Sequence, residues 1–462
     1  MYEDLVKEIF TRFPSVQKDG FMKGAYKPGL EAMREFNAAM GDPAGKLKVI
    51  HVAGTNGKGS VANMIASALT EAGYKTGLYT SPHLVDWRER SRINGTMIPK
   101  DYAEAFLVKW KPYFTEHNLS FFEITTGLAL RWFADEKTDF AVLEVGLGGR
   151  LDSTNIVTPV VSVITSIGLD HCALLGNTLE AIAGEKAGII KPGVPVIIGE
   201  TRPETQKVFD AKADETGSPI IYAQETTPRL WDRHREILDA MDLRAPVQEK
   251  NLRTVLCTLE EISRLRPSDF ARNDKADGTP VISTEPNLPV ISTEPNLPVI
   301  STERSEWRDL IHGIEHTAAL MHFHGRWERL QSEPEVIADI GHNAHALRSN
   351  FETLEATGRP LFIVYGIMAD KDLDAILPLM PRKARYIFVT PDTPRARRAD
   401  DILERFLDYA CGSARNDRRA TTAPSVKAGV EMALREAGKD AIIYIGGSAF
   451  VVAEALQGTE LE

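Results

Sequence analysis

The residues best suited to chemistry form one glycine-rich stretch, His51-Val-Ala-Gly-Thr-Asn-Gly-Lys-Gly-Ser60. Its small residues let backbone N–H groups face an anion, and Lys58 is long enough to reach the β- and γ-phosphates of a nucleotide. The stretch departs from the common phosphate loop, because only two residues separate Gly54 from Gly57 and the hydroxyl of Ser60 comes one position late. It predicts a nucleoside triphosphate site, with a glycine-rich turn that binds no ligand as the alternative.

The residues on either side of this loop predict the elements that would position it. Val49, Ile50 and Val52 are typical of a buried strand, and Val61–Ala72 has the apolar spacing of a helix. A helix that begins at the loop directs its partial positive charge at a bound phosphate. Strand, loop and helix therefore follow in the order that a phosphate cradle requires.

A second candidate follows the strand-like run Phe140–Val145, where Glu144 is followed by glycines at positions 146, 148 and 149. Ligands in open α/β sheets gather at the carboxyl ends of the strands. Glu144 could there bind a metal directly or through water, and the glycines permit close approach of the backbone. A solvated carboxylate before a loose turn explains the pattern equally well.

Three further positions carry weaker signals. His171 follows the run Val160–Ile167 and could join a metal shell, although most single histidines do not. Lys186 lies near the end of the predicted helix Leu179–Lys186, where interaction with the helix dipole explains it as well. Ser81 follows Lys75–Tyr79 and would lie near the phosphate loop if these two strands are neighbours. An ordinary Ser-Pro turn is the alternative.

One motif points to different chemistry. His312-Gly-Ile-Glu-His316 fits a zinc-peptidase pattern. Gly313 weakens the helix that would align the two histidines, and no acidic partner follows downstream. We do not favour zinc catalysis.

The overall composition limits the class of protein. With 462 residues, 43% of them hydrophobic and 26% charged, the chain fits a soluble globular protein of two domains. No run approaches the length of a membrane span, and the acidic N-terminus lacks a signal-peptide core. Three widely spaced cysteines are typical of reduced thiols, and the net charge of −11 argues against nucleic-acid or anionic-membrane partners. We expect a cytoplasmic monomer.

Strand-like and helix-like segments alternate along most of the chain, which indicates parallel strands with helical crossovers. The predicted strands, besides those above, are Val194–Ile198, Val336–Ile340, Leu361–Tyr365, Tyr386–Val389 and Ala441–Ile445. The predicted helices include Asp101–His117, Ser120–Asp135, Ala344–Ala356, Asp372–Leu379, Asp400–Tyr409 and Val426–Ala437.

The fold class is therefore α/β with two domains. We expect an N-terminal phosphate-loop NTPase-like domain with a parallel sheet over residues 1–323 and a smaller C-terminal α/β domain over residues 324–462. Between the two patterns, a nine-residue repeat (Pro280–Leu288 and Pro289–Leu297, within an insertion near 272–303) extends a loop. Its prolines argue against paired strands.

Taken together, these segments resemble the folylpolyglutamate synthase / dihydrofolate synthase family of ATP-dependent amide ligases. The resemblance covers nearly the whole chain except the repeat. The segments that carry it are Tyr26-Lys-Pro-Gly-Leu30, His51–Ser60, Thr80-Ser-Pro-His-Leu84, Glu89-Arg90, Ser120-Phe-Phe-Glu123, Glu144–Asn155, Asp170-His171, Leu179–Gly188, Lys250-Asn251 with Thr254, Gly325-Arg326, Asp339-Ile-Gly-His-Asn343, Asp370-Lys-Asp372 and Pro391-Asp-Thr-Pro-Arg395.

The resemblance implies a reaction and its substrates. A carboxylate of dihydropteroate or of a folate attacks the γ-phosphate of ATP and becomes an acyl phosphate. The amine of L-glutamate then attacks the activated carbonyl and expels phosphate. Two anions must be aligned and screened, which calls for Mg²⁺ and cationic side chains in a cleft that closes between the two domains.

The resemblance also implies roles for single residues. The triphosphate would be held by the loop residues Asn56, Gly57, Lys58, Gly59 and Ser60. Magnesium would be bound by Ser81, Glu144 and His171, and Lys186 matches a lysine that is carbamylated in this family. Asn251 would contact adenine, while Arg326 and Asp339 would reach phosphate and ribose. The pterin pocket would be lined by Phe122, Glu123, Asp152 and Asn155.

Two details depart from the family pattern. His324 stands where many relatives have proline, and Asp339-Ile-Gly-His-Asn343 is a variant of the usual motif. Two other functions stay open. A muramyl-peptide ligase would favour a separate N-terminal nucleotide-sugar domain, whereas only about 46 residues precede the first strand here. A non-ligating phosphate-loop protein would bind nucleotide without forming a glutamate-dependent product.

Overall fold

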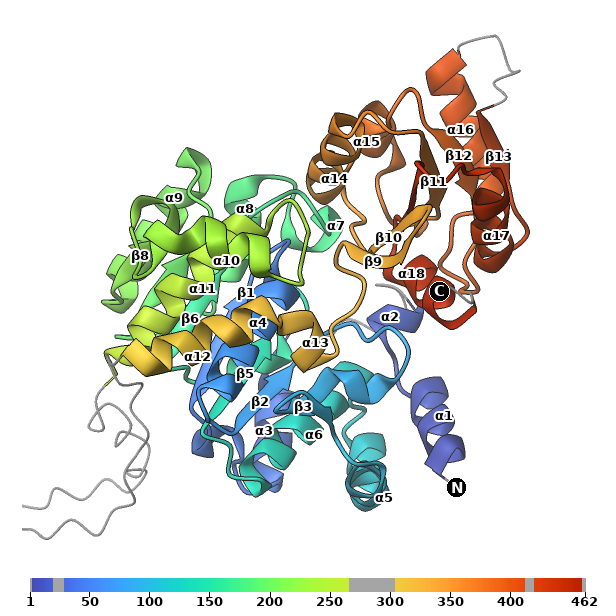
Figure 1. Cartoon of the computed structure of the whole chain (residues 1–462). Helices are drawn as coiled ribbons and strands as arrows, with labels where there is room; N and C mark the ends of the chain where they lie inside the picture. The colour runs from blue at the N-terminus through green and yellow to red at the C-terminus, as the bar shows by residue number, and fades with distance from the viewer. Residues whose placement is uncertain (1, 20–28, 266–303, 412–418, 459–462) are drawn as a thin grey trace, which may run out of the picture.

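The computed structural model describes residues 2–19, 29–265, 304–411 and 419–458. Two α/β domains lie side by side, and the chain passes from one to the other once, after helix α13 (Thr317–Met321) (Figure 1). The nine-residue repeat and residues 26–28 lie outside the described residues.

The N-terminal domain is built on an eight-stranded sheet. Six neighbouring strands are parallel, and β3 and β4 are added at one edge through antiparallel pairing. The strand order is β4 (Thr96–Met97), β3 (Ser91–Ile93), β2 (Thr76–Tyr79), β5 (Phe140–Glu144), β1 (Val49–Ala53), β6 (Val161–Ile164), β7 (Val196–Ile198) and β8 (Ile220–Tyr222).

Helices cover both faces of this sheet. One face is packed by α4 (Lys58–Glu71), α10 (His234–Ala240), α11 (Gln248–Ser263) and α12 (Arg304–Glu315). The other is packed by α1 (Tyr2–Arg12), α3 (Glu31–Ala39), α5 (Lys100–Glu116) and α6 (Phe121–Asp135). The helices α2 (Val16–Asp19), α7 (Cys172–Leu175), α8 (Leu179–Ala187) and α9 (Pro203–Thr216) complete the domain.

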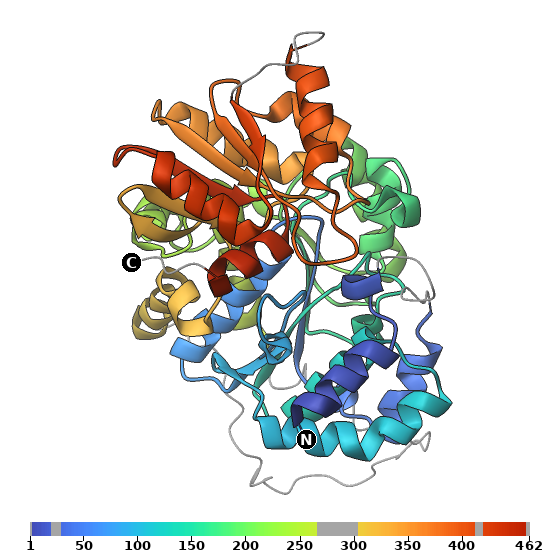
Figure 2. The ribbon, with the colours of Figure 1, turned by 90° about the vertical axis from the view of Figure 1, so that its right-hand side faces the viewer.

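The C-terminal domain repeats this arrangement with six strands (Figure 2). Their order is β13 (Ala420–Thr422), β12 (Arg385–Phe388), β11 (Leu361–Tyr365), β14 (Ile442–Gly446), β10 (Glu335–Asp339) and antiparallel β9 (Glu328–Ser332). The helices are α14 (Ala344–Ala356), α15 (Leu373–Ile376), α16 (Ala399–Cys411), α17 (Val426–Glu436) and α18 (Ala449–Gly458).

Burial on both faces explains why the central strands are continuous apolar runs. Along β14, Ile442 and Tyr444 pack beneath the α14–α16 side, while Ile443 and Ile445 pack beneath α17 and α18. Successive side chains of a strand point to opposite faces, so both rows must be apolar when both faces are covered.

The predicted elements with continuous apolar runs are confirmed. The strand β11 and the helix α14 have the bounds that the sequence predicts, and the strand β1 contains the predicted residues Val49, Ile50 and Val52. The short strands β3, β4 and β9 were not predicted, because they carry charged or polar side chains and too few residues to show a period.

The condition that the sequence analysis attached to Ser81, that the strands β1 and β2 are neighbours, is not met. The strands β1 and β2 are not adjacent, because β5 pairs with both of them and lies between them. Ser81 nevertheless comes close to the centre of the sheet, because it follows β2 directly and meets the end of β5.

The zinc-peptidase pattern lies on a packing helix. Helix α12 runs through Gly313, which sits so close to α4 that an added Cβ would be 2.5 Å from the Ser67 carbonyl oxygen. His312 contacts Glu71. Within the described ranges, no group of three or more His, Cys, Asp or Glu side chains is placed to hold a metal ion. Over the same residues, no helix is long and apolar enough to cross a bilayer.

Candidate functional site

The phosphate loop has the geometry of an anion cradle. It connects β1 to α4, and Gly57 stands at the helix N-cap with φ +85°, a left-handed conformation that suits glycine. Lys58 is the first residue of the helix, and its Nζ donates to the Thr55 carbonyl at 3.2 Å. Burial lowers the pKa of Lys58, while the charges of Glu144 and Asp170 oppose the shift. The loop thus presents a helix N-terminus and a partly buried lysine side chain at one point.

Glu144 ends the neighbouring strand β5 and faces this loop. The carboxylate is buried, and its Oε2 accepts a 3.0 Å hydrogen bond from the Ser81 backbone N–H. Burial raises the pKa of Glu144, whereas the charges of Lys58 and Arg326 and the Ser81 N–H lower it. The carboxyl end of β5 and the Ser81 turn are therefore in direct contact.

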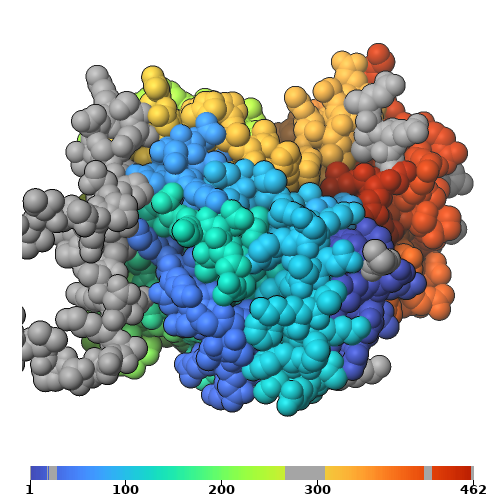
Figure 3. Space-filling view, turned by 90° about the horizontal axis from the view of Figure 1, so that it is seen from below, coloured from blue at the N-terminus to red at the C-terminus, as the bar shows by residue number. Residues whose placement is uncertain are grey.

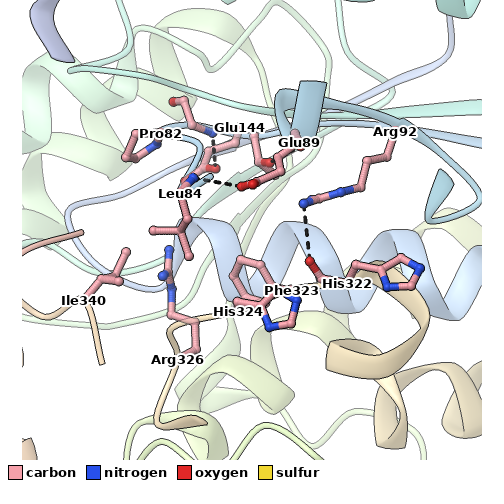
Figure 4. Close-up of a pocket in the computed structure, with 12 residues that line it drawn as sticks. Pro82, Leu84, Glu89, Arg92, Glu144, His322, Phe323, His324, Arg326 and Ile340 are labelled. Carbon is pink, nitrogen blue, oxygen red and sulfur yellow. Dashed lines mark hydrogen bonds between the residues drawn. The ribbon is translucent and has the colours of Figure 1, made fainter. Parts of the chain in front are cut away.

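Arg326 reaches this point from the segment that joins the two domains. Its guanidinium lies over the Phe323 ring at 4.8 Å and points into a small cavity that also contains Glu144, Pro82 and Leu84 (Figure 4). An added Cβ at Gly59 would be 3.4 Å from Arg326 Nη2 and 3.6 Å from Glu144 Oε1. Arg326, the phosphate loop and Glu144 therefore surround one volume.

Lys186 lies beneath the glycine loop that follows β5. The side chain is only 3% exposed, because Gly149 packs on α8 so closely that a Cβ would be 3.0 Å from Lys186 Cα. Burial, reinforced by the charge of Lys58, lowers the pKa of Lys186 to about 7. A substantial fraction of this amine is uncharged at neutral pH.

His171 is the N-cap of α7 and has a left-handed conformation, with φ +53°. Burial is the main cause that lowers its pKa to about 3, which leaves the imidazole neutral and able to bind a metal. The preceding residue, Asp170, accepts hydrogen bonds from three residues of the C-terminal domain: Lys371 at 2.7 Å, Asn343 at 3.1 Å and His342 at 3.2 Å.

This carboxylate belongs to the domain interface. Burial would raise the pKa of Asp170, but the hydrogen bond and charge of His342, with the charges of His171 and Lys371, lower it overall. The side chains of Asp170 and Lys371 are each 9% exposed, so the ion pair is almost fully removed from water.

The phosphate loop itself contacts the C-terminal domain. Asn56 and Asn343 exchange two amide hydrogen bonds of 3.2 and 3.0 Å, and Asn56 Nδ2 also lies 2.9 Å from His345 Nδ1. His345 in turn meets Arg202 at 3.0 Å. The N-terminus of α14 therefore rests on the loop that is predicted to hold the nucleotide.

A larger cavity of about 240 Å³ lies where the two domains meet. Its walls come from both domains. They include Ser81, Arg90, Phe122, Asp152 and His171 on one side and His342, Met368, Lys371, Arg395 and Phe450 on the other. Arg395 also donates to the carbonyls of Val16 and Gln17 in α2. The dark blue N-terminal segment lies directly against the orange and red C-terminal domain (Figure 3).

Two of the predicted pocket residues lie elsewhere. Glu123 caps α6, where its carboxylate accepts from the backbone N–H and hydroxyl of Ser120, and it does not line the cavity. Asn155 donates to the carbonyls of Arg150 and Gly188, so it fastens the glycine loop to the end of α8. Both support the elements that carry Phe122 and Asp152. Their contact with a ligand stays a prediction.

The predicted nucleotide contacts are distributed around the loop. Asn251 on α11 is buried against it, since a Cβ at Gly57 would be 2.7 Å from Asn251 Oδ1. Asp339 ends β10 and accepts from the backbone of Trp327 and Gly341 and from Asn350. Burial raises the pKa of Asp339. Its carboxylate orders the segment next to Arg326.

Sequence reasoning did not assign roles to Asp170, Asn343, Lys371 and Arg395, although all four lie in segments of the resemblance. The sequence shows that these side chains are charged or polar, but it does not show their partners, because the partners of each lie in the other domain. Only proximity to His171 and to the Asp339–Asn343 run could have drawn attention to them.

Comparisons with known proteins identify the family of the chain. The Mur ligase middle domain matches residues 52–235, and the Mur ligase glutamate ligase domain matches residues 325–449. The dihydrofolate synthase/folylpolyglutamate synthase of Bacillus subtilis is 32% identical over 86% of this chain and 89% of its own length.

Two solved structures extend the likeness to the whole fold. E. coli FolC in complex with DHPP and ADP has a TM-score of 0.74 and 27% identity, covering 98% of this chain and 97% of that chain. The bifunctional folylpolyglutamate synthase/dihydrofolate synthase of Yersinia pestis, complexed with AMPPNP and Mn ion, has a TM-score of 0.71 and 25% identity, covering 95% of each chain. The chain therefore belongs to the folylpolyglutamate synthase / dihydrofolate synthase family of ATP-dependent amide ligases.

Proposed function

We propose that this enzyme adds L-glutamate to the carboxylate of dihydropteroate, of a folate, or of both, through an acyl phosphate formed with ATP. One observation carries the proposal. The phosphate site, which contains Glu144, adjoins the cavity that is lined by Phe122 and Asp152. Ser81 connects the two, because its backbone N–H donates to Glu144 and it also lines the cavity. A flat acid bound against Phe122 would direct its carboxylate towards the γ-phosphate.

The donor set fits a magnesium ion. Mg²⁺ prefers oxygen ligands and retains several waters, so one carboxylate with hydroxyls and nucleotide phosphates is sufficient. Glu144 and Ser81 would hold it, with neutral His171 near a second ion. The bound ion would screen the repulsion between the triphosphate and the attacking carboxylate. Lys58 and Arg326 provide fixed positive charge on either side of the same volume.

We further propose that Lys186 is carbamylated. A neutral amine attacks CO₂, a nitrogen–carbon bond forms and one proton leaves, which converts the buried lysine into a carboxylate. The lowered pKa of Lys186 supports this, because the uncharged amine is the reactive form. The position near Asp152 and Asp170 calls for a counter-cation, which bound metal would supply.

The assignments of Asn251 to adenine, of Asp339 to ribose, and of Glu123 and Asn155 to the pterin pocket stay part of the proposal. So does the boundary between the domains at residues 323 and 324. It is supported by the end of α13 at Met321 and the start of β9 at Glu328. We also propose a cytoplasmic monomer without nucleic-acid or membrane partners. Light scattering on the purified protein and cell fractionation test the oligomeric state and the location.

One assay tests the activity. Purified protein, MgATP and radiolabelled L-glutamate are incubated separately with dihydropteroate and with tetrahydrofolate. We expect an amide product and stoichiometric ADP with at least one acceptor. No incorporation with either acceptor, from protein that still binds ATP, contradicts the proposed function and favours a nucleotide-binding protein that does not ligate.

A further inference from the structure

A buried histidine of β1 is connected to the cavity by a chain of hydrogen bonds. His51 Nε2 lies 2.8 Å from Thr154 Oγ1, and Thr154 Oγ1 lies 2.5 Å from Asp152 Oδ1. His51 and Thr154 are fully buried, and Asp152 is 5% exposed at the wall of the cavity. The chain therefore runs from the interior of the sheet to the proposed ligand site.

The donors and acceptors of this chain can be assigned by counting hydrogens. A threonine hydroxyl has one hydrogen, and the short contact to the Asp152 carboxylate requires it there. Thr154 can then only accept from His51, so His51 must carry its hydrogen on Nε2. Its Nδ1 has no hydrogen-bond partner within the described part of the chain. An unpaired acceptor at Nδ1 is less costly than the unpaired buried N–H of the other tautomer.

The surroundings keep the histidine neutral. Burial, and to a smaller extent the charge of Lys191, lowers the pKa of His51 to about 3. A neutral imidazole has a single N–H, so the direction of the chain is determined by the tautomer. If His51 were to carry its hydrogen on Nδ1, the Thr154 hydroxyl would turn towards Nε2. The two oxygens at 2.5 Å would then face each other without a hydrogen unless Asp152 took up a proton.

The Asp152 carboxylate is held from several sides. Its Oδ2 accepts from the Leu147 N–H at 2.9 Å and its Oδ1 from the Thr154 N–H at 3.0 Å. Burial raises the pKa of Asp152, and these donors with the Thr154 hydroxyl oppose that rise. Loss of the hydroxyl bond would both favour the protonated acid and release one constraint on its orientation.

We propose that His51 is a positioning residue for the acceptor substrate: by donating to Thr154 it directs the Thr154 hydroxyl to Asp152, which then presents an oriented carboxylate acceptor at the cavity wall. This inference rests on the proposed function, in which a pteridine ring occupies the cavity beside Phe122. The ring edge of a pteridine carries N–H donors, which an acceptor at Asp152 would bind. A protonated or rotated Asp152 would bind them less well.

The tautomer can be measured without any activity. In protein labelled with ¹⁵N at its histidines, long-range ¹H–¹⁵N spectra distinguish the two neutral tautomers, and the signals that vanish in His51→Gln identify His51. We expect the Nε2–H form at pH 7. Observation of the Nδ1–H form or of the imidazolium overturns the proposal.

Kinetics test the consequence for the substrate. We expect Thr154→Val and His51→Leu each to raise the KM for the pteridine acid about tenfold while the KM for ATP changes less than twofold. Thr154→Ser and His51→Gln, which retain a donor in place, should stay within threefold of wild type. Because both residues act through one chain, the double variant should be no worse than either single variant.

The controls separate positioning from general damage. Thr205→Val removes another fully buried threonine hydroxyl, which donates to the Arg202 carbonyl at 3.3 Å, and should leave both KM values unchanged. Additive effects of His51→Leu and Thr154→Val, equal losses for ATP and acceptor, or an unchanged acceptor KM overturn the proposal. If wild-type protein glutamylates no pteridine acid, the proposed function fails, and the tautomer measurement still decides whether His51 directs Thr154.

Discussion

At the scale of single residues, the site depends on two lysines with different environments, the partly buried Lys58 and the buried Lys186. Lys58 lies at the helix N-terminus, where the charges of Glu144 and Asp170 partly offset the cost of burial. Lys186 lies beneath the glycine loop, where the charge of Lys58 adds to the effect of burial and its pKa falls to about 7. Lys58 is suited to binding an anion because it carries a positive charge, and Lys186 is suited to reacting because its amine is neutral.

For Lys58, we expect the Ala substitution to reduce turnover by about 10²–10³-fold or more, because it removes a fixed positive charge from the phosphate site. The thermal midpoint should change little, because the lysine side chain that is removed is only partly buried. The exposed Lys75, paired with Glu136 at 2.7 Å, offers the control Lys75→Ala, which should keep wild-type turnover. Turnover retained in Lys58→Ala refutes the phosphate role.

For Lys186, the carbamate should be visible by ¹³C NMR after incubation with labelled bicarbonate. The amine is mostly protonated below pH 7 and mostly neutral above it, so the carbamate signal should grow as the pH rises from about 6 to 8. Lys186→Ala should lack the signal and most of the activity. A signal that is absent from wild type, or that survives in Lys186→Ala, contradicts the proposal.

At the scale of elements, close packing of α12 on α4 keeps the phosphate helix in place. Gly313 allows this approach, because a Cβ there would be 2.5 Å from Ser67 O and 2.7 Å from Ala68 Cα. The Ser67 hydroxyl also donates to the Gly313 carbonyl at 2.7 Å. The glycine that weakens a zinc-peptidase interpretation is therefore explained by helix packing.

We expect Gly313→Ala to lower the free energy of unfolding by about 1–3 kcal/mol, because backbone atoms must move to admit the methyl group. Gly184 on α8 is the matched control, since nothing lies within 4 Å of its Cβ position. Gly184→Ala should be neutral or stabilising by up to about 1 kcal/mol through its helix propensity. Urea unfolding compares them, and equal midpoints for the two variants would show that the α4–α12 contact is not tight.

At the scale of the whole molecule, the site is complete only when the two domains are together. Asp170 binds Lys371, His342 and Asn343 across the interface, and Asn56 binds Asn343. These contacts place the start of α14 on the phosphate loop and close the cavity on one side. Domain closure would exclude water from the acyl phosphate.

Lys371→Met should loosen this interface, because it leaves the buried Asp170 carboxylate without its lysine partner. Removing one partner of a buried ion pair costs about 3 kcal/mol of interaction free energy. We expect a larger radius of gyration without ligands by X-ray scattering, and a KM for L-glutamate raised about tenfold or more. Lys439→Met is the control, because Lys439 pairs with Glu333 at the surface with a side chain that is 88% exposed. An unchanged radius and KM in Lys371→Met would refute a role of this pair in closure.

Much of this was predictable from sequence, for a physical reason. A strand buried on both faces must be apolar throughout, so β1, β5 and β11 can be recognised from the sequence. The residues of the phosphate loop between β1 and α4 lie within ten consecutive positions, so this motif can be recognised as well. Edge strands such as β3 and β9 are short and polar, and local pattern did not reveal them.

The amino-acid sequence specifies which chemical groups are available: a phosphate loop with Lys58, carboxylates at strand ends, and the set of segments that marks the family. Which of these groups come into contact follows from the three-dimensional fold. Asp170 and Lys371 are 201 residues apart, and His51 and Thr154 are 103 apart, yet both pairs are in contact. Strand order and domain contact create these pairs. Strand order and domain contact both arise from packing between residues that are far apart in the sequence. The periodic pattern of apolar residues within a single segment does not encode such packing.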